Sequence, residues 1–122
     1  MSDYLRIRTL VEISEHSDYH RAQQAALEFT ATPDEWESQK VDAAVAGTTV
    51  ELGNYTTVTA IVVENTDGTN FVEVTHTYDA VARVTYLPAG GHTIIYNPTA
   101  ANDLVLTADT AVCACKVWIV GT

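Results

Sequence analysis

Apolar and polar residues alternate with a period of two along most of the chain. In "YLRIRTLVEI", residues 4–13, the mostly apolar odd positions from Leu5 to Ile13 alternate with Arg6, Arg8, Leu10 and Glu12, which predicts a half-buried strand. Further runs rich in Val, Ile, Thr and Tyr follow at 48–52, 56–65, 69–76, 80–87, 92–96, 103–108 and 112–120. Short strands separated by Gly, Pro, Asn and Asp at this spacing predict an all-β, antiparallel sandwich or barrel.

The segment 16–40 fits this pattern less well. "DYHRAQQAALEF" can be drawn as a helix with Tyr19, Ala22, Ala26 and Phe29 on one stripe, but it also alternates as a strand. In "TPDEWESQK", Thr32, Pro33 and Glu35 have the arrangement of a capping box, which begins a helix. We therefore expect a strand near 24–31 and at most one helical turn near 33–37.

The stretch "VVENTDGTNFVEV", residues 62–74, could be an acidic calcium loop or a turn. An EF-hand loop needs an oxygen ligand at its first position and Gly at its sixth, and placing Gly68 sixth puts Val63 first. Asp-Gly is, by contrast, a favoured pair for a type I′ turn. We therefore predict a two-residue hairpin at Asp67-Gly68. Its register places Val63 opposite Val72 and Ile61 opposite Val74, on one apolar face.

The opposite faces of these predicted strands are also partly apolar. In the hairpin, this second face would carry Val62, Glu64, Phe71 and Glu73. In the last strand, inward-facing cysteines would leave Trp118 facing outward between valines. Such outer faces are unusual for a monomer, so we expect either a second layer of the fold or another subunit to cover them, and we favour a contribution from subunits.

Length and charge narrow the possible partners. With 122 residues the chain is expected to form a single domain over 1–122. Sixteen acidic and six basic side chains give a net charge of −10, which repels phosphate and anionic lipid, so we expect no nucleic-acid or membrane partner. The first residues, "MSDYLRIRTLVEIS", do not have the pattern of a signal peptide, and we expect folding in a cytosol.

Residues with catalytic or metal-binding chemistry are few. His16 and His20 would share a face only on a helix, no serine lies in a G-x-S-x-G motif, and "PAGGH" lacks the lysine of a phosphate loop. Cys113 and Cys115 would lie on one face of a strand, about 6.5–7 Å apart, an awkward span for a disulfide, so buried thiols are favoured over redox or metal chemistry. We expect neither an enzyme nor a cofactor.

Three segments carry a resemblance to a known family. "ELGNYTTVTAIVVENTDGTNFVEV", "RVTYLPAGG" and "ADTAVCACKVWIV" together resemble small β-sandwich virion proteins of tailed double-stranded DNA bacteriophages. The matching positions are Gly53-Asn54, Asn65 through Val72, and Pro88 through Gly91, and the resemblance covers roughly 37–120. It implies a jelly-roll-like sandwich of about eight strands, a structural role, no catalytic residues, and a homo-oligomer that is commonly a trimer.

This resemblance predicts a capsid decoration or cement protein that binds the major capsid protein and stabilises the head shell. The net charge favours the outer surface of the virion, away from packaged DNA. We expect residues 1–13, with Arg6 and Arg8, to contribute to docking. The alternative is a neck, tail or fibre-associated sandwich that binds another virion protein, or a host glycan through tyrosines and tryptophans.

Overall fold

The computed structural model describes residues 5–13, 23–33, 35–52, 55–78, 80–98 and 104–122. Within these residues there is no helix, and all ten strands pair antiparallel, which confirms the predicted all-β, sandwich-like class. The chain divides into two compact units, Met1–Pro33 and Asp34–Thr122, each described here by itself. The expectation of a single domain stays a prediction.

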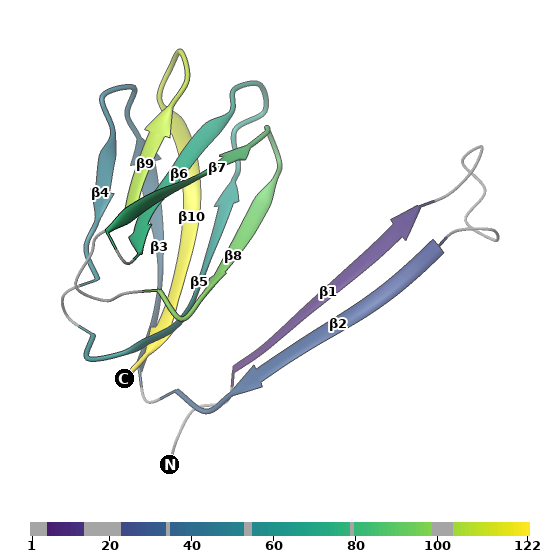
Figure 1. Ribbon diagram of the computed structural model, residues 1–122. Helices are drawn as coiled ribbons and strands as arrows, with labels where there is room; N and C mark the ends of the chain where they lie inside the picture. The colour runs from purple at the N-terminus through teal and green to yellow at the C-terminus, as the bar shows by residue number, and fades with distance from the viewer. Residues whose placement is uncertain (1–4, 14–22, 34, 53–54, 79, 99–103) are drawn as a thin grey trace. The chain divides into compact units, whose positions relative to one another are not determined.

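The first unit is a two-stranded antiparallel ribbon. β1 (Leu5–Ile13) pairs with β2 (Gln23–Ala31) along its whole length (Figure 1). Both strands agree with the sequence-based predictions, including the strand near 24–31. Ile7 lies opposite Phe29 and both are half-buried, whereas Leu10 and Leu27 are exposed.

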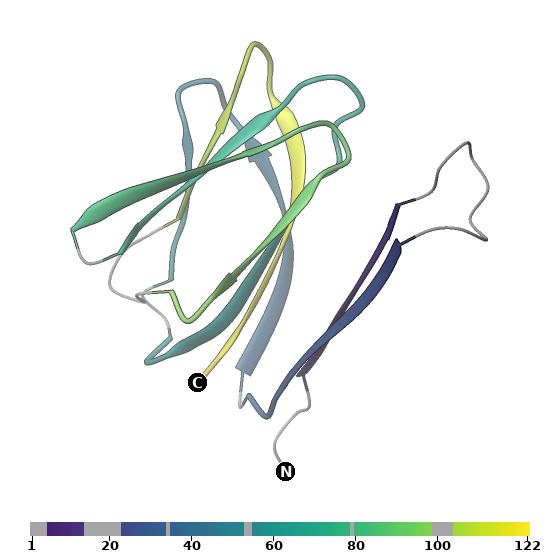
Figure 2. The same ribbon diagram turned by 45° about the vertical axis from the view of Figure 1, so that its right-hand side comes forward.

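The second unit is a sandwich of two four-stranded sheets, packed face to face (Figures 1 and 2). The first sheet has the order β3 (Glu35–Ala43), β10 (Cys113–Gly121), β5 (Val58–Asn65), β8 (His92–Tyr96). The second has the order β4 (Thr48–Val50), β9 (Leu104–Ala108), β6 (Val72–Tyr78), β7 (Val81–Leu87).

The strand pairs of the sandwich are nested. β3 pairs with β10, β4 with β9, β5 with β8 and β6 with β7, which is the pairing of one long antiparallel ribbon. Additional pairing of β10 with β5, and of β9 with β6, rolls this ribbon into two sheets. As a result, consecutive strands lie in opposite sheets at every connection except β6–β7.

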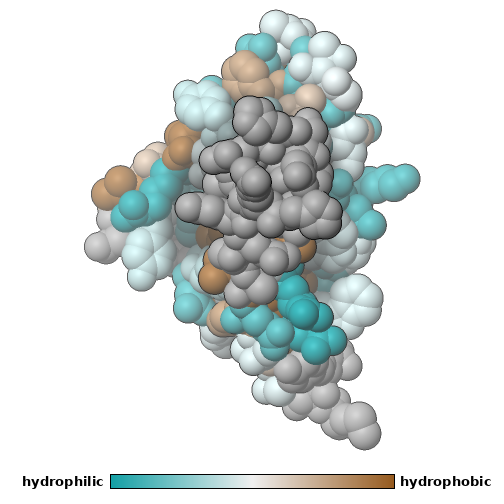
Figure 3. Space-filling model, turned by 90° about the vertical axis from the view of Figure 1, so that its right-hand side faces the viewer, coloured by the Kyte–Doolittle hydropathy of each residue, from teal (hydrophilic) through white to brown (hydrophobic). Residues whose placement is uncertain are grey.

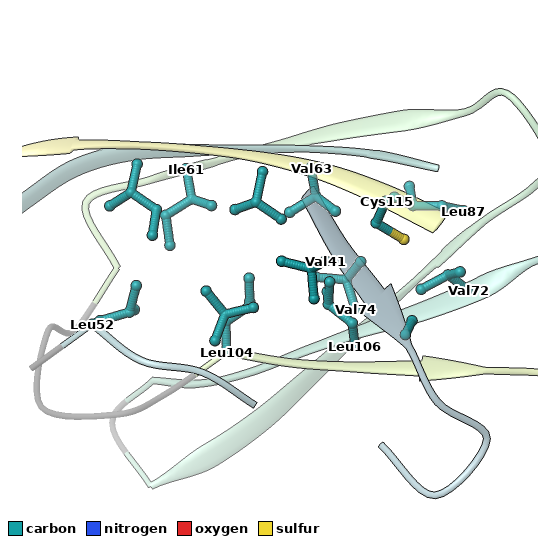
Figure 4. Close-up of a cluster of buried hydrophobic side chains, with 14 of the residues drawn as sticks. Val41, Leu52, Ile61, Val63, Val72, Val74, Leu87, Leu104, Leu106 and Cys115 are labelled. Atoms are coloured by element: carbon teal, nitrogen blue, oxygen red, sulfur yellow. The ribbon is translucent and has the colours of Figure 1, made fainter. Parts of the chain in front are cut away.

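Apolar side chains fill the space between the sheets. At the surface visible in Figure 3, hydrophobic residues are interspersed with hydrophilic ones. In the core, Ile61 and Val63 extend from the first sheet towards Leu104 and Leu106 of the second (Figure 4), and all four side chains are fully buried. β6, β9 and β10 contribute alternate residues to this layer, as the period-two pattern predicted, whereas β7 and β8 contribute one residue each.

The predicted hairpin at Asp67-Gly68 is wrong. β5 and β6 do not pair with each other, because they belong to opposite sheets. Neither Asp67 nor Gly68 has the positive φ that a type I′ turn requires. The apolar face was nevertheless assigned correctly, since Ile61, Val63, Val72 and Val74 are all buried. These side chains belong to facing sheets rather than to neighbouring strands.

No helical turn is present at the described residues 33 and 35–37, where at most one was expected. Residues 35–43 form β3, which pairs with β10 from Glu35 opposite Gly121 to Ala43 opposite Cys113. The capping box is a local preference, and a full-length ladder with a neighbouring strand outweighs it.

Gly121 is required where the last strand meets the start of β5. The register shifts between Val120 and Gly121, and the Thr122 amide donates to the Thr57 carbonyl at 2.8 Å. A Cβ atom at position 121 would collide with the Thr57 carbonyl oxygen and lie 3.1 Å from Tyr55. Only glycine permits this close approach of two backbones.

We predict that Gly121→Ala lowers the free energy of unfolding by about 1–3 kcal/mol, because the added methyl group overpacks a backbone contact. Gly68→Ala is the matched control, since a Cβ there meets nothing within 4 Å and φ is not positive. The control should change stability by less than about 0.5 kcal/mol. Urea denaturation measures both values, and equal effects of the two substitutions would contradict the assigned role of Gly121.

Candidate functional site

The outward side of the first sheet carries two adjacent rows of apolar side chains. One row runs from Trp36 through Val120 and Ala60 to Tyr96, and the next from Ser38 through Trp118 and Val62 to Ile94. We call the apolar members of these rows the apolar face: Trp36, Ala60, Val62, Ile94, Tyr96, Trp118 and Val120. Alternation places them outward because their sequence neighbours, such as Ile61, Val117 and Ile119, fill the core.

Aromatic rings dominate the accessible part of the apolar face. Trp36 is 61% exposed and Tyr96 47% exposed, while Trp118, Val62 and Ile94 are half-buried. The Lys116 ammonium lies 4.8 Å from the centroid of the Trp118 ring, within cation–π distance.

A polar row borders the apolar face. Lys40, Lys116, Glu64 and His92 lie side by side across the four strands. An aromatic centre beside a charged margin is the composition of protein–protein interfaces. Two of the predicted interface residues, Val62 and Trp118, therefore lie within the apolar face, and Glu64 lies on its border.

Phe71 and Glu73 do not share this surface. Glu73 lies on β6 between Tyr86 and Thr107, and the Phe71 ring contacts the Tyr86 ring with centroids 5.8 Å apart. Because β5 and β6 lie in opposite sheets, the structure does not bring Val62 and Glu64 onto one face with Phe71 and Glu73. The prediction that these four residues form one surface is wrong, although an interface role for each stays a prediction.

Arg6 and Arg8 lie on β1 in the first unit, and both are exposed. The Arg8 Nε atom is 3.6 Å from Glu28 Oε2, opposite it on β2. Because both side chains are largely exposed, this ion pair contributes little to stability. The two arginines are thus available for contact with another molecule.

Sequence reasoning missed three members of the apolar face: Trp36, Ile94 and Tyr96. The sequence analysis expected at most a helical turn around Trp36, so it did not assign this residue to the face of a sheet. "HTIIY" does alternate, which groups Ile94 with Tyr96, but this pattern does not say which face points outward. That information comes only from the pairing of β8 with β5.

The loop that follows β5 is organised by the buried side chain of Asn65. Its Nδ2 donates to the carbonyls of Asn70, Leu87 and Pro88 at 2.9, 3.1 and 3.2 Å. Its Oδ1 accepts from the Asp67 amide at 3.1 Å. One side chain therefore connects the 65–71 loop to the turn after β7.

Asp67, which suggested a calcium ligand, bonds instead to its own loop. Its carboxylate accepts from the Thr69 and Asn70 amides at 2.9 and 2.6 Å. Both bonds lower the pKa of the Asp67 carboxyl group, and the bond from Asn70 has the larger effect. The residues described contain no group of three His, Cys, Asp or Glu side chains able to hold a metal ion.

Cys113 and Cys115 are free and buried, as predicted. Burial is the main cause that raises the pKa of both thiols, to about 11 for Cys115. They are therefore protonated at neutral pH and form part of the hydrophobic core.

Comparison with protein-family models, curated proteins and solved structures finds no match to this chain. Among the residues described, no helix is long and apolar enough to cross a membrane. The function is therefore argued from the residues and the geometry.

We predict that Asn65→Ala lowers the free energy of unfolding by about 2–3 kcal/mol, because it leaves buried backbone groups without hydrogen bonds. Asn70→Ala is the control, since among the described residues that side chain makes only an exposed 3.1 Å bond, from the Thr110 hydroxyl. It should cost less than about 0.5 kcal/mol. Thermal or urea unfolding compares the two, and a neutral Asn65→Ala variant would refute the anchoring role.

Proposed function

We propose that this protein is a structural component of a tailed-bacteriophage virion, a capsid decoration or cement protein on the outer surface of the head shell. In this proposal it binds the major capsid protein and assembles with copies of itself, with a trimer favoured. The sequence resemblance over roughly 37–120 suggests the class of protein. The apolar face is the structural observation that carries the proposal.

Strand order supports the jelly-roll part of the resemblance. Counted within the second unit, the two sheets have the orders 1-8-3-6 and 2-7-4-5. A rolled ribbon with nested pairs gives this order, and the jelly roll is the eight-stranded double-sheet architecture built in that way. We therefore infer that the sandwich is a jelly roll.

The apolar face supports an interaction between copies. An exposed Trp36 and Tyr96 beside half-buried Trp118 present aromatic surface of the kind that dominates binding energy at protein interfaces. Burial of this surface against another copy removes it from water, and the row containing Glu64 and Lys116 then fixes the orientation.

Charge supports an outward position on the particle. The second unit carries eleven acidic and three basic residues, a net charge of −8, against five and three, a net charge of −2, in the first unit. A sandwich with this charge repels packaged DNA. In the proposal the first unit, with Arg6 and Arg8, contributes to docking on the shell or on a neighbouring copy.

We predict that particles of the phage encoding this chain contain hundreds of copies, in a fixed ratio to the shell protein. Quantitative mass spectrometry of purified particles measures the number. Arg6→Ser should lower it, while Arg83→Ser, which removes the same charge from the second sheet, should not. A handful of copies per particle would refute decoration and favour the neck, tail or fibre alternative.

We predict that Trp36→Glu shifts the purified protein from an oligomer to a monomer, because a charge within a buried contact is costly. Native mass spectrometry measures the state directly. Val45→Glu is the control, since Val45 is also exposed but lies outside the apolar face. A monomeric wild-type protein, or an unchanged Trp36→Glu oligomer, would contradict self-association through this face.

A further inference from the structure

His76 occupies a position where the core pattern calls for an apolar residue. It follows Val72 and Val74 along the inward side of β6, with Leu104 and Arg83 opposite it on the two neighbouring strands. The residue is only 5% exposed, and its Nε2 atom is buried without a hydrogen-bond partner. An unpaired buried polar atom of this kind is costly, so a role beyond packing is expected.

A pocket of about 340 Å³ opens beside His76, between the edge strands of the two sheets. His76, Tyr78 and Arg83, from β6 and β7, form one wall. The end of β8 and the residues after it, 95–98, form the other. The volume is at the lower end of the range for small-molecule sites, which suits a single ring rather than an extended chain.

The pocket has an unusual charge for this protein. Although the chain carries a net charge of −10, the described residues that line the pocket include the Arg83 guanidinium and no carboxylate. Arg83 is exposed and makes no ion pair with the part of the chain that the structure describes. A guanidinium in this setting offers two parallel N–H donors to a carboxylate.

The remaining lining residues suit a sugar ring. Tyr78 and Tyr96 provide aromatic surface, and Ile95 and Pro98 provide apolar surface, against which the C–H groups of a pyranose can pack. The Asn97 side-chain amide and the tyrosine hydroxyls provide polar atoms for ring hydroxyls.

We propose that this pocket binds a carboxylate-bearing monosaccharide unit of the hexuronate class. Arg83 pairs with the carboxylate, the tyrosines contact the ring, and His76 forms part of the pocket wall. The site shares Tyr96 with the apolar face but uses none of its other members, and it does not depend on the proposed virion role.

We predict saturable binding of glucuronate to the full-length protein, followed by NMR through the His76 ring signals and the Arg83 side-chain N–H signals. Glucose, which lacks the carboxylate, should bind at least about tenfold more weakly, because a hydrogen bond to a charged group is lost. Acetate, which lacks the ring, should also bind more weakly than glucuronate. No saturable shift up to about 10 mM glucuronate, well above a millimolar Kd, would overturn the proposal.

Two variants separate a binding role from a structural one. Arg83→Gln should weaken glucuronate binding roughly ten- to a hundredfold without lowering stability, because Arg83 is exposed. His76→Phe keeps an aromatic ring but removes the unpaired nitrogen, so it should fold at least as stably as the wild type. Lys40→Gln, an exposed cation outside the pocket, is the charge control. Wild-type affinity in Arg83→Gln, or equal binding of glucose, would overturn the proposal.

Discussion

The single layer of aliphatic side chains between the two sheets of the second unit is the constraint on which the other features depend. Ile61, Val63 and Val117 of the first sheet and Leu104, Leu106 and Val74 of the second belong to this layer, to which β9 and β10 contribute strictly alternate residues. Because consecutive strands mostly lie in opposite sheets, no strand pair is stable without the facing sheet. The loops must therefore cross the edge of the core, and they need polar anchors there, of which Asn65 is the best connected.

Inward positions become polar where the facing sheet ends. On β3, Glu37 lies opposite the buried Ile119, and it accepts a hydrogen bond from the Tyr55 hydroxyl. Burial is the larger cause and this bond the second, and together they raise the pKa of Tyr55 to about 12. At the other edge, the inward positions of β6 and β7 change from Val74 and Leu87 to His76 and Arg83. At both edges, the inward positions of a strand hold apolar residues over the core and polar residues beyond it.

The outward faces of the two sheets differ in kind. The first sheet presents the apolar face with its aromatic rings, and the second presents threonines together with Glu73 and the Phe71–Tyr86 pair. Threonine satisfies the preference of strands for β-branched side chains while leaving a hydroxyl for water. Exposed aromatic rings therefore lie on both sides of the sandwich, Trp36 and Tyr96 on the first sheet and Tyr86 on the second.

Period-two alternation in the sequence was enough to place most strands and to assign buried residues such as Ile61, Val63, Cys113 and Cys115. Alternation reports which side chains share a face, since it follows from backbone geometry alone. It does not report which strands pair. A hairpin turn within one sheet and a connection that crosses to the facing sheet give the same local pattern, as at Asp67-Gly68.

The tertiary structure decided the rest. It made residues 35–43 a strand through a ladder with β10, although a local capping box favoured a helix. It also separated Val62 and Glu64 from Phe71 and Glu73, and brought His76 and Arg83 together with the end of β8. The sequence by itself determined the core-forming residues and the all-β class, which depend on nearest neighbours along the chain. The surfaces and the pocket depend on strand order, which arises only from contacts between residues far apart in sequence.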